Sequence, residues 1–267
     1  MRGVAKRPGP LRSGAAASLL SLAAASLLAA CGGHGPFTTS SSTPKPGAER
    51  GSGTGSTHAL TRAQAQRLVA AVNLTAADLP GFTLSREARE HATEAERRLE
   101  GELLRCIGMG GLAGAAQPVA HGSSGDFHHR GAGYDVGVSS EISVSSGPGA
   151  GAADLRRLRS SRARGCLGHF LVELFKGRRY GGATVARVSI TQGSPPAAGT
   201  TGGFGWRITA TIDSRGIRLP YYMDILGFLY GPAEVTLLST GLPVPLPAAI
   251  QERLFAVLLM RATALGR

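Results

Sequence analysis

The sequence predicts an α+β fold, in which helices flank an antiparallel β-sheet that is a meander in its C-terminal third. Two observations support this prediction. Segments in which apolar residues alternate with polar ones follow each other with only short turns between them, and other segments carry apolar residues at helical spacing. From residue 59 to residue 267 we find neither a linker nor an internal repeat, so we expect this stretch to be one sensor-like domain.

The first helix of this domain is predicted from capping signals. In LTRAQAQRLVAAV, Thr61 and Gln64 have the spacing of a capping box. Thr75 and Asp78 indicate one further helical turn, which ends at the following Leu-Pro-Gly. Residues 82–84 are then a candidate short strand.

A second helix is expected to begin at Thr93, because Glu96 supplies another capping-box partner. Its apolar residues recur at helical spacing and therefore define one buried face. The residues of this face are Leu99, Leu103, Cys106 and Ile107. The pattern thus predicts that Cys106 points into the core.

The remaining elements follow from periodicity. YDVGVSSEISVS, from residue 134, alternates as a strand does, and a helical stretch with Leu155 and Leu158 comes after it. A further helix covers residues 167–174. Alternating strands cover 186–190, 204–212 and 217–225, with a hairpin turn at 213–216, and the last helix carries an apolar stripe over 250–258.

The first 30 residues have the pattern of an export signal. The basic start MRGVAKRPGPLRSG precedes an apolar run over residues 15–30, which is shorter and richer in alanine than a membrane span of about 20 residues. The run ends in LAAC, which resembles the bacterial lipobox. This resemblance implies cleavage before Cys31 and attachment of a diacylglycerol to its sulfur, so residues 1–30 are the expected lipoprotein signal peptide. The alternative is a plain secretory signal with an incidental cysteine.

Residues 31–58 are expected to be a lipidated, disordered tether, because Gly, Ser, Thr and Pro dominate this segment and leave little to bury. A flexible coil of this length reaches roughly 30 Å. We therefore expect the domain to be lipid-anchored at the extracytoplasmic face of the cell membrane.

The two other cysteines are expected to form a disulfide. If Cys31 carries lipid, only Cys106 and Cys166 remain, and an exported protein folds in an oxidising compartment. A disulfide that closes the loop between them stabilises the folded state by roughly 4 kcal/mol on the chain-entropy model. Two buried free thiols are the alternative.

Several short motifs resemble an actinobacterial family of envelope lipoproteins and extracellular sensor domains of mycobacterial Ser/Thr kinases. They are LTAADLPGF, RCIG, SSEISVSS, RGCLGHFL, YYMDILGFLYG and LLMRA. The resemblance implies a ligand- or signal-binding domain with a helix-flanked antiparallel sheet. The kinase sensor domains have two disulfides, whereas this chain can form only the one that matches Cys106 and Cys166. Because the chain has no kinase domain, we expect a free-standing binding lipoprotein.

The chain is strongly basic, with 29 Lys and Arg against 17 Asp and Glu and a net charge of +12. Its dense basic run is a candidate contact for anionic headgroups or envelope polymers, the alternative being a solvated helix face. The run contains Arg156, Arg157, Arg159, Arg162 and Arg164. No aromatic residues interleave with it, and an exported chain does not meet nucleic acid, so we expect no nucleic-acid partner.

Sites for cofactors, metals or catalysis are not indicated. Gly147-x-Gly149-x-x-Ala152 lies between a strand and a helix, but the next strand ends at Gln192 with no acid to bind a ribose. Asp126 and His128 can share one face of an extended segment, with His129 opposite, but further ligands are missing, so a solvated loop is the simpler interpretation. We expect no catalytic residues, no metal and no cofactor.

Taken together, these features predict a non-catalytic, monomeric lipoprotein whose domain binds an unknown envelope ligand or protein. Two alternatives stay open. One is a lipid carrier with an apolar cavity between sheet and helices, and the other is an envelope hydrolase.

Overall fold

The structure is a computed structural model that describes residues 60–85, 94–108, 118–145, 151–177, 184–214 and 216–264. These residues form α-helices, one 3-10 turn and an eight-stranded antiparallel sheet, which confirms the α+β prediction. The helical elements are α2 (Arg62–Val72), η1 (Ala76–Asp78), α3 (Glu94–Ile107), α4 (Gly151–Leu158), α5 (Ser161–Gly177) and α6 (Ala248–Ala264). The expected signal peptide, Cys31 and the tether lie outside the described residues, as do Thr93, Gly147 and Gly149.

The strands are paired antiparallel in the order β1-β3-β4-β8-β7-β6-β5, and β2 pairs with the part of β4 that β3 leaves free. The C-terminal strands β5 to β8 form the expected meander. Strand β8, at one edge of this meander, also pairs with β4 over nearly its whole length. The strands are β1 (Thr83–Leu84), β2 (Ala120–Ser123), β3 (Phe127–Gly131), β4 (Tyr134–Val144), β5 (Thr184–Gly193), β6 (Gly202–Ser214), β7 (Ile217–Tyr230) and β8 (Ala233–Leu242).

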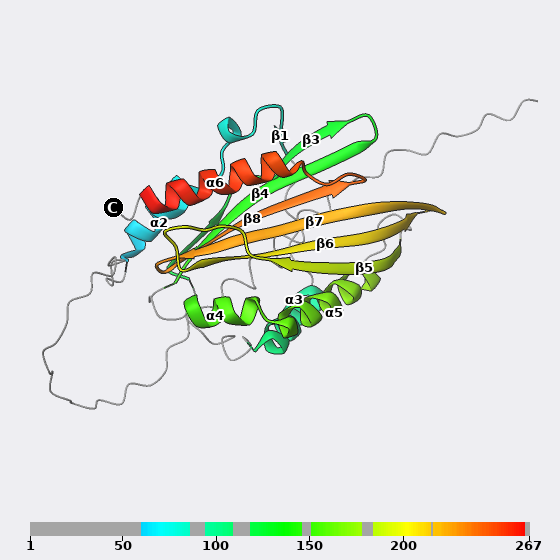
Figure 1. Cartoon of the computed structure of the whole chain (residues 1–267), viewed down its shortest axis with the longest axis horizontal. Helices are drawn as coiled ribbons and strands as arrows, with labels where there is room; N and C mark the ends of the chain where they lie inside the picture. Colours follow the sequence, from blue (N-terminus) through cyan, green and yellow to red (C-terminus); the bar gives the residue numbers. More distant parts are fainter. Residues whose placement is uncertain are drawn as a thin grey trace, which may run out of the picture.

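Helices lie on both faces of the sheet (Figure 1). Helices α2 and α6 pack on one face, over β2, β4, β7 and β8. Helices α3, α4 and α5 lie on the other face, where α5 contacts β5 and α4 contacts β6. We call these the α6 face and the α5 face.

Each face has its own apolar core, because successive residues of a strand point to opposite sides. On the α6 face, the predicted stripe of β4 packs beneath the helices, and Phe228 of β7 meets Phe255 of α6 edge to face at 5.5 Å. On the α5 face, Trp206, Ile208 and Met223 are buried against α5. Full burial of one such side chain contributes about 1.5–3 kcal/mol, so both helical layers stabilise the sheet.

The N-terminal capping signals form as predicted. Thr61 and Gln64 close a reciprocal capping box at the start of α2. At η1 the backbone N–H and the hydroxyl of Thr75 both donate to Asp78 Oδ2. Helix α3 begins at Glu94, one residue after the expected cap. These boundaries are set by short-range hydrogen bonds, which explains why the local sequence is sufficient to predict them.

Two sequence-based expectations are wrong. Cys106 is exposed rather than turned into the core, because it lies at the edge of the face that buries Leu103 and Ile107. Residues 126–128 are not a solvated loop: strand β3 begins at Phe127, and His128 is buried. Pairing with the long strand β4 supplies the hydrogen bonds that make β3 a strand despite its two histidines.

Candidate functional site: a buried polar strip on the sheet

Buried polar side chains gather on the α5 face of β4 and β8, the half of that face that lies beyond the strands covered by α4 and α5. We call this set the polar strip. It consists of Ser139, Glu141 and Ser143 of β4 and Glu234, Thr236 and Thr240 of β8. The same strands bury apolar residues on their α6 face, so the strip lies directly behind an ordinary core.

Strand register brings the strip together. Glu141 is opposite Thr236, and Ser143 is opposite Glu234. Directly opposed residues on one face of an antiparallel pair have Cβ atoms about 4.5–5.5 Å apart. The two carboxylates and the hydroxyl of Thr236 therefore occupy neighbouring positions on one surface.

On its β7 side the strip borders the apolar core. Thr236 is opposite Gly227, and Leu229 is opposite Glu234. A Cβ atom at Gly227 would lie 2.3 Å from the ring of Phe204, so the glycine makes room for this ring beside Thr236. The strip is thus a polar surface that continues into an aromatic and aliphatic one.

The hydroxyl of Thr236 has no hydrogen-bond partner among the described residues, although the side chain is only 1% exposed. A buried hydroxyl without a partner costs about 1–3 kcal/mol. The large majority of buried side-chain polar atoms in native structures are hydrogen-bonded, so each exception calls for an explanation. Thr236 is therefore the member of the strip that most directly indicates a binding role.

One end of the strip reaches solvent at His121 of β2. His121 Nε2 lies 3.3 Å from Glu141 Oε1, and the histidine side chain is 41% exposed against 9% for the glutamate. When the imidazole is protonated, the two groups form an ion pair. The strip therefore reaches the surface at a half-exposed imidazole.

At the other end, His128 and Arg130 of β3 converge on Asp135 of β4. His128 Nδ1 lies 3.0 Å from Asp135 Oδ1, and Arg130 Nε donates to Oδ2 at 2.9 Å. Burial raises the pKa of Asp135, but the hydrogen bonds from His128 and Arg130 outweigh it, and the pKa lies below its ordinary value. Asp135 is consequently ionised at neutral pH and holds the His128 ring in one orientation.

The ring of His128 lies over Gly137, which separates it from Thr240. An added Cβ at Gly137 would lie 2.6 Å from Thr240 Oγ1 and 3.3 Å from His128 Cε1. Nε2 of His128 has no hydrogen bond within the described part of the chain. The Asp135–His128 pair thus orients an imidazole towards the Thr240 end of the strip and can offer it to a ligand as a donor or an acceptor.

His129 faces the opposite side of the sheet, as the sequence predicts. Its Nδ1 donates to the carbonyl of Gly81 at 2.8 Å, so its Nε2 accepts the hydroxyl of Tyr134 at 2.9 Å. These bonds fasten the β3–β4 hairpin to the turn before β1. His129 has a structural role there, and Asp126 lies outside the strand that carries both histidines.

Within the described ranges, no group of three or more His, Cys, Asp and Glu residues is arranged to hold a metal ion. None of the helices described is long and apolar enough to cross a membrane.

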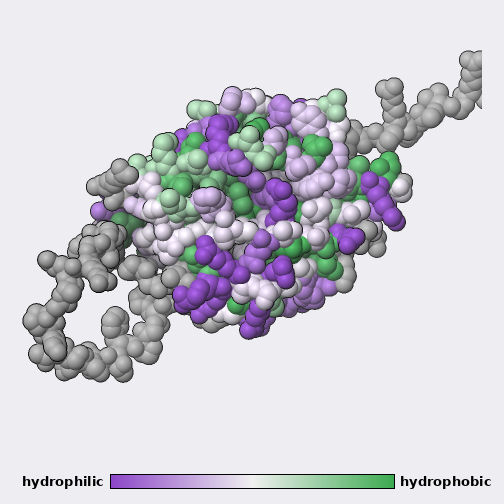
Figure 2. Space-filling view, viewed as in Figure 1, coloured by the Kyte–Doolittle hydropathy of each residue, from purple (hydrophilic) through white to green (hydrophobic). Residues whose placement is uncertain are grey.

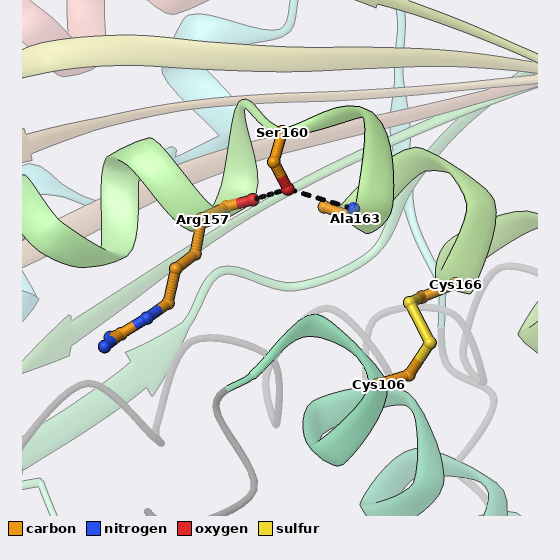
Figure 3. Close-up of a disulfide and its surroundings, with 5 residues drawn as sticks. All are labelled: Cys106, Arg157, Ser160, Ala163 and Cys166. Carbon is orange, nitrogen blue, oxygen red and sulfur yellow. Dashed lines mark hydrogen bonds between the residues drawn. A yellow bond between two sulfur atoms is a disulfide. The ribbon is translucent and has the colours of Figure 1, made fainter.

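The predicted disulfide is present: Cys106 of α3 and Cys166 of α5 are bonded, with their Cα atoms 5.8 Å apart (Figure 3). It joins two of the helices that lie on the α5 face. Because both sulfurs are in the bond, neither cysteine is available as a nucleophile or a metal ligand.

The basic run divides into two kinds of residue. Arg159 donates from Nε to the carbonyl of Gly203 at 2.8 Å, and thus ties α4 to β6. Arg156, Arg162 and Arg164 are exposed at the junction of α4 and α5. Arg157 and Arg159 are exposed as well, so what distinguishes Arg159 is its hydrogen bond to the backbone of β6.

The polar strip was not predicted from the sequence. Asp135, Ser139, Glu141 and Ser143 occupy alternate positions of a strand, and such a pattern ordinarily marks a solvent face. The signal that could have revealed it is the same pattern in β8, where Glu234 and Thr236 alternate with Ala233, Val235 and Leu237 in a strand that the meander places inside the sheet.

Comparison of the chain with protein-family models gives no match, and neither does comparison with curated proteins.

Proposed function

We propose that this protein is a non-catalytic, membrane-anchored extracytoplasmic lipoprotein that binds a small envelope ligand at the polar strip. The observation that carries the proposal is the buried hydroxyl of Thr236, which has no partner within the described residues and lies between a carboxylate and an apolar surface. A ligand that donates a hydrogen bond there would remove the penalty of the unsatisfied group.

The chemistry of the strip indicates the class of ligand. A threonine hydroxyl both accepts and donates hydrogen bonds. The unpartnered hydroxyl of Thr236 therefore suits a molecule with a hydrogen-bonding group on one side and an apolar surface on the other, which would face Phe204 and Leu229. Binding sites for small molecules commonly combine a few polar groups with such an apolar wall.

The membrane anchor of this proposal rests on the lipobox-like LAAC and on the Gly/Ser/Thr/Pro-rich stretch after it. Two acyl chains give stable anchoring where one chain gives only marginal binding. The family resemblance, which we also retain as a proposal, supports an extracytoplasmic binding domain. Cells labelled with a fatty-acid analogue test the anchor: we expect labelled protein from the wild type and none from Cys31→Ala, and equal labelling would contradict it.

Mass spectrometry of small molecules that co-purify with the natively processed protein tests the binding site. We expect a molecule that the wild type retains and that Thr236→Val retains at a tenfold lower level, which corresponds to about 1.4 kcal/mol for one hydrogen bond. Thr209→Val is the matched control, because Thr209 lies in β6 on the α6 face. Equal retention by all three proteins, or no retained molecule, would contradict a ligand site at the strip.

A further inference from the structure

The junction of α4 and α5 presents a basic surface that the polar strip does not use. It is formed by Arg156 in the last turn of α4 and by Arg162 and Arg164 in the first turn of α5. All three side chains are exposed. None of them has an ion-pair or hydrogen-bond partner among the described residues, and we call these three residues the basic elbow.

The geometry of the elbow is held by short-range bonds. Ser160 Oγ donates to the carbonyl of Arg157 at 2.6 Å and accepts the backbone N–H of Ala163 at 3.1 Å, so it joins the end of α4 to the start of α5 (Figure 3). Arg159 fastens the same junction to the carbonyl of Gly203. The nearby Cys106–Cys166 disulfide clamps α5 to α3. The arginines therefore project from a fixed scaffold.

Among the described side chains, the three elbow arginines have no acidic partner. The first turn of α5 contains no acidic residue. The three arginines carry like charges, which repel one another, and the chain as a whole has a net charge of +12. In Figure 2, hydrophilic side chains gather over α4 and the beginning of α5. An extended anionic surface would relieve this repulsion.

We propose that the basic elbow docks the domain on anionic phospholipid headgroups. The arginines supply charge complementarity, since arginine pairs with phosphate through two parallel hydrogen bonds. Val172 favours a membrane over a soluble polyanion: it is a large apolar side chain on α5 that is 37% exposed, and the boundary between headgroups and acyl chains accommodates such groups. Docking at α4–α5 leaves α2 and α6, on the other face of the sheet, turned away from the membrane.

This inference is independent of the polar strip and of the lipid anchor. Its test uses the processed chain, residues 31–267, with Cys31→Ser, so that neither the signal segment nor acylation contributes, and vesicles of phosphatidylcholine alone or with phosphatidylglycerol. The variant is Arg156→Gln/Arg162→Gln/Arg164→Gln. Arg62→Gln/Arg67→Gln/Arg187→Gln is the matched control, because it removes the same charge from exposed arginines of α2 and β5.

A basic side chain near an anionic surface raises binding roughly fivefold, so the elbow variant should bind phosphatidylglycerol vesicles about a hundredfold more weakly. We expect the control to stay within a few-fold of the parent, and 0.5 M salt to abolish the difference between the two vesicle types. Equal losses in elbow and control variants would overturn the proposal, as would unchanged vesicle binding. Elbow-dependent binding of soluble poly(glycerol phosphate) without binding of vesicles would also overturn it, in favour of an envelope polymer.

Discussion

Arg261 of α6 holds Asp78 of η1 through two hydrogen bonds: Nη1 lies 3.0 Å from Oδ2 and Nη2 lies 2.7 Å from Oδ1. Nη1 also donates to the carbonyl of Asn73 at 2.9 Å. Helix α6 is thereby fastened to η1, the turn that follows α2. Arg261 and Asn73 are 188 positions apart in the sequence, and their contact secures the helical layer on the α6 face.

Arg261→Ala should destabilise the protein by about 2 kcal/mol at pH 7, because hydrogen bonds between charged groups contribute about 1.5–3 kcal/mol. Urea denaturation measures this change. Arg67→Ala is the control, since Arg67 is exposed in α2 and substitution there should stay within about 0.5 kcal/mol. A loss of the same size in both variants would mean that the ion pair adds nothing.

The effect of Arg261→Ala should depend on pH in a defined direction. Burial raises the pKa of Asp78, but the hydrogen bonds from Arg261 and Thr75 outweigh it and leave the pKa below its ordinary value. A group with a lowered pKa stabilises the folded state above its unfolded pKa, about 3.9 for Asp, and that contribution is lost as the pH falls through the folded pKa. The stability difference between wild type and Arg261→Ala should therefore be constant at pH 5–7 and shrink below pH 4. A difference that grows on acidification would contradict this.

Gly137→Ala should destabilise the protein by about 1–3 kcal/mol, because the new Cβ would lie 2.6 Å from Thr240 Oγ1 and 3.3 Å from His128 Cε1. Gly193→Ala is the matched control, since this strand glycine has no atom within 4 Å of an added Cβ. In a double-mutant cycle with Thr240→Ala, the free energy of unfolding should fall less in the double variant than the sum of the two single losses, by about 1 kcal/mol. Strict additivity would show that the contact with Thr240 is not what excludes a side chain at position 137.

Removal of the disulfide by Cys106→Ser/Cys166→Ser should lower the free energy of unfolding by about 4 kcal/mol, given a sequence separation of 60 residues. Thermal and urea unfolding in the absence of reductant measure this loss. Cys31→Ser is the control and should leave the stability of the domain unchanged, because Cys31 precedes the domain. A free energy of unfolding that dithiothreitol leaves unchanged in the wild-type protein would show that the bridge does not contribute.

The features that could be predicted from the sequence are those that depend on interactions between residues close together in the chain. Thr61 and Gln64 bond to each other across one turn, and the alternation of β4 reports directly which residues face α6. Such features are visible in a few consecutive residues. The α+β fold could therefore be predicted with no knowledge of distant contacts, whereas the disulfide between residues 60 positions apart was predicted from the number of cysteines.

The polar strip depends on long-range pairing and could not be predicted in the same way. Glu141 and Thr236 become neighbours only because β8 returns to pair with β4, and no local pattern specifies that return. Nor does a local pattern show that the polar side of these strands is buried rather than solvated. The two histidines of β3 show the same limit, since their alternation predicted opposite faces but not the burial of His128.

Thr236→Val should stabilise the protein by about 1 kcal/mol while it weakens ligand retention. The hydroxyl is buried without a partner among the described residues, and replacing an unsatisfied polar group by an apolar group of the same shape removes its desolvation penalty. Thr209→Val, at a partly exposed position on the other face of the sheet, should change stability by less than about 0.5 kcal/mol. Differential scanning calorimetry of the ligand-free proteins measures both changes.

A destabilised Thr236→Val protein would mean that the hydroxyl is already hydrogen-bonded in the folded state, and the strip would then be a structural network. A gain in stability together with a loss of the retained molecule is the combination expected of a residue kept for binding, since functional sites commonly retain groups that reduce stability.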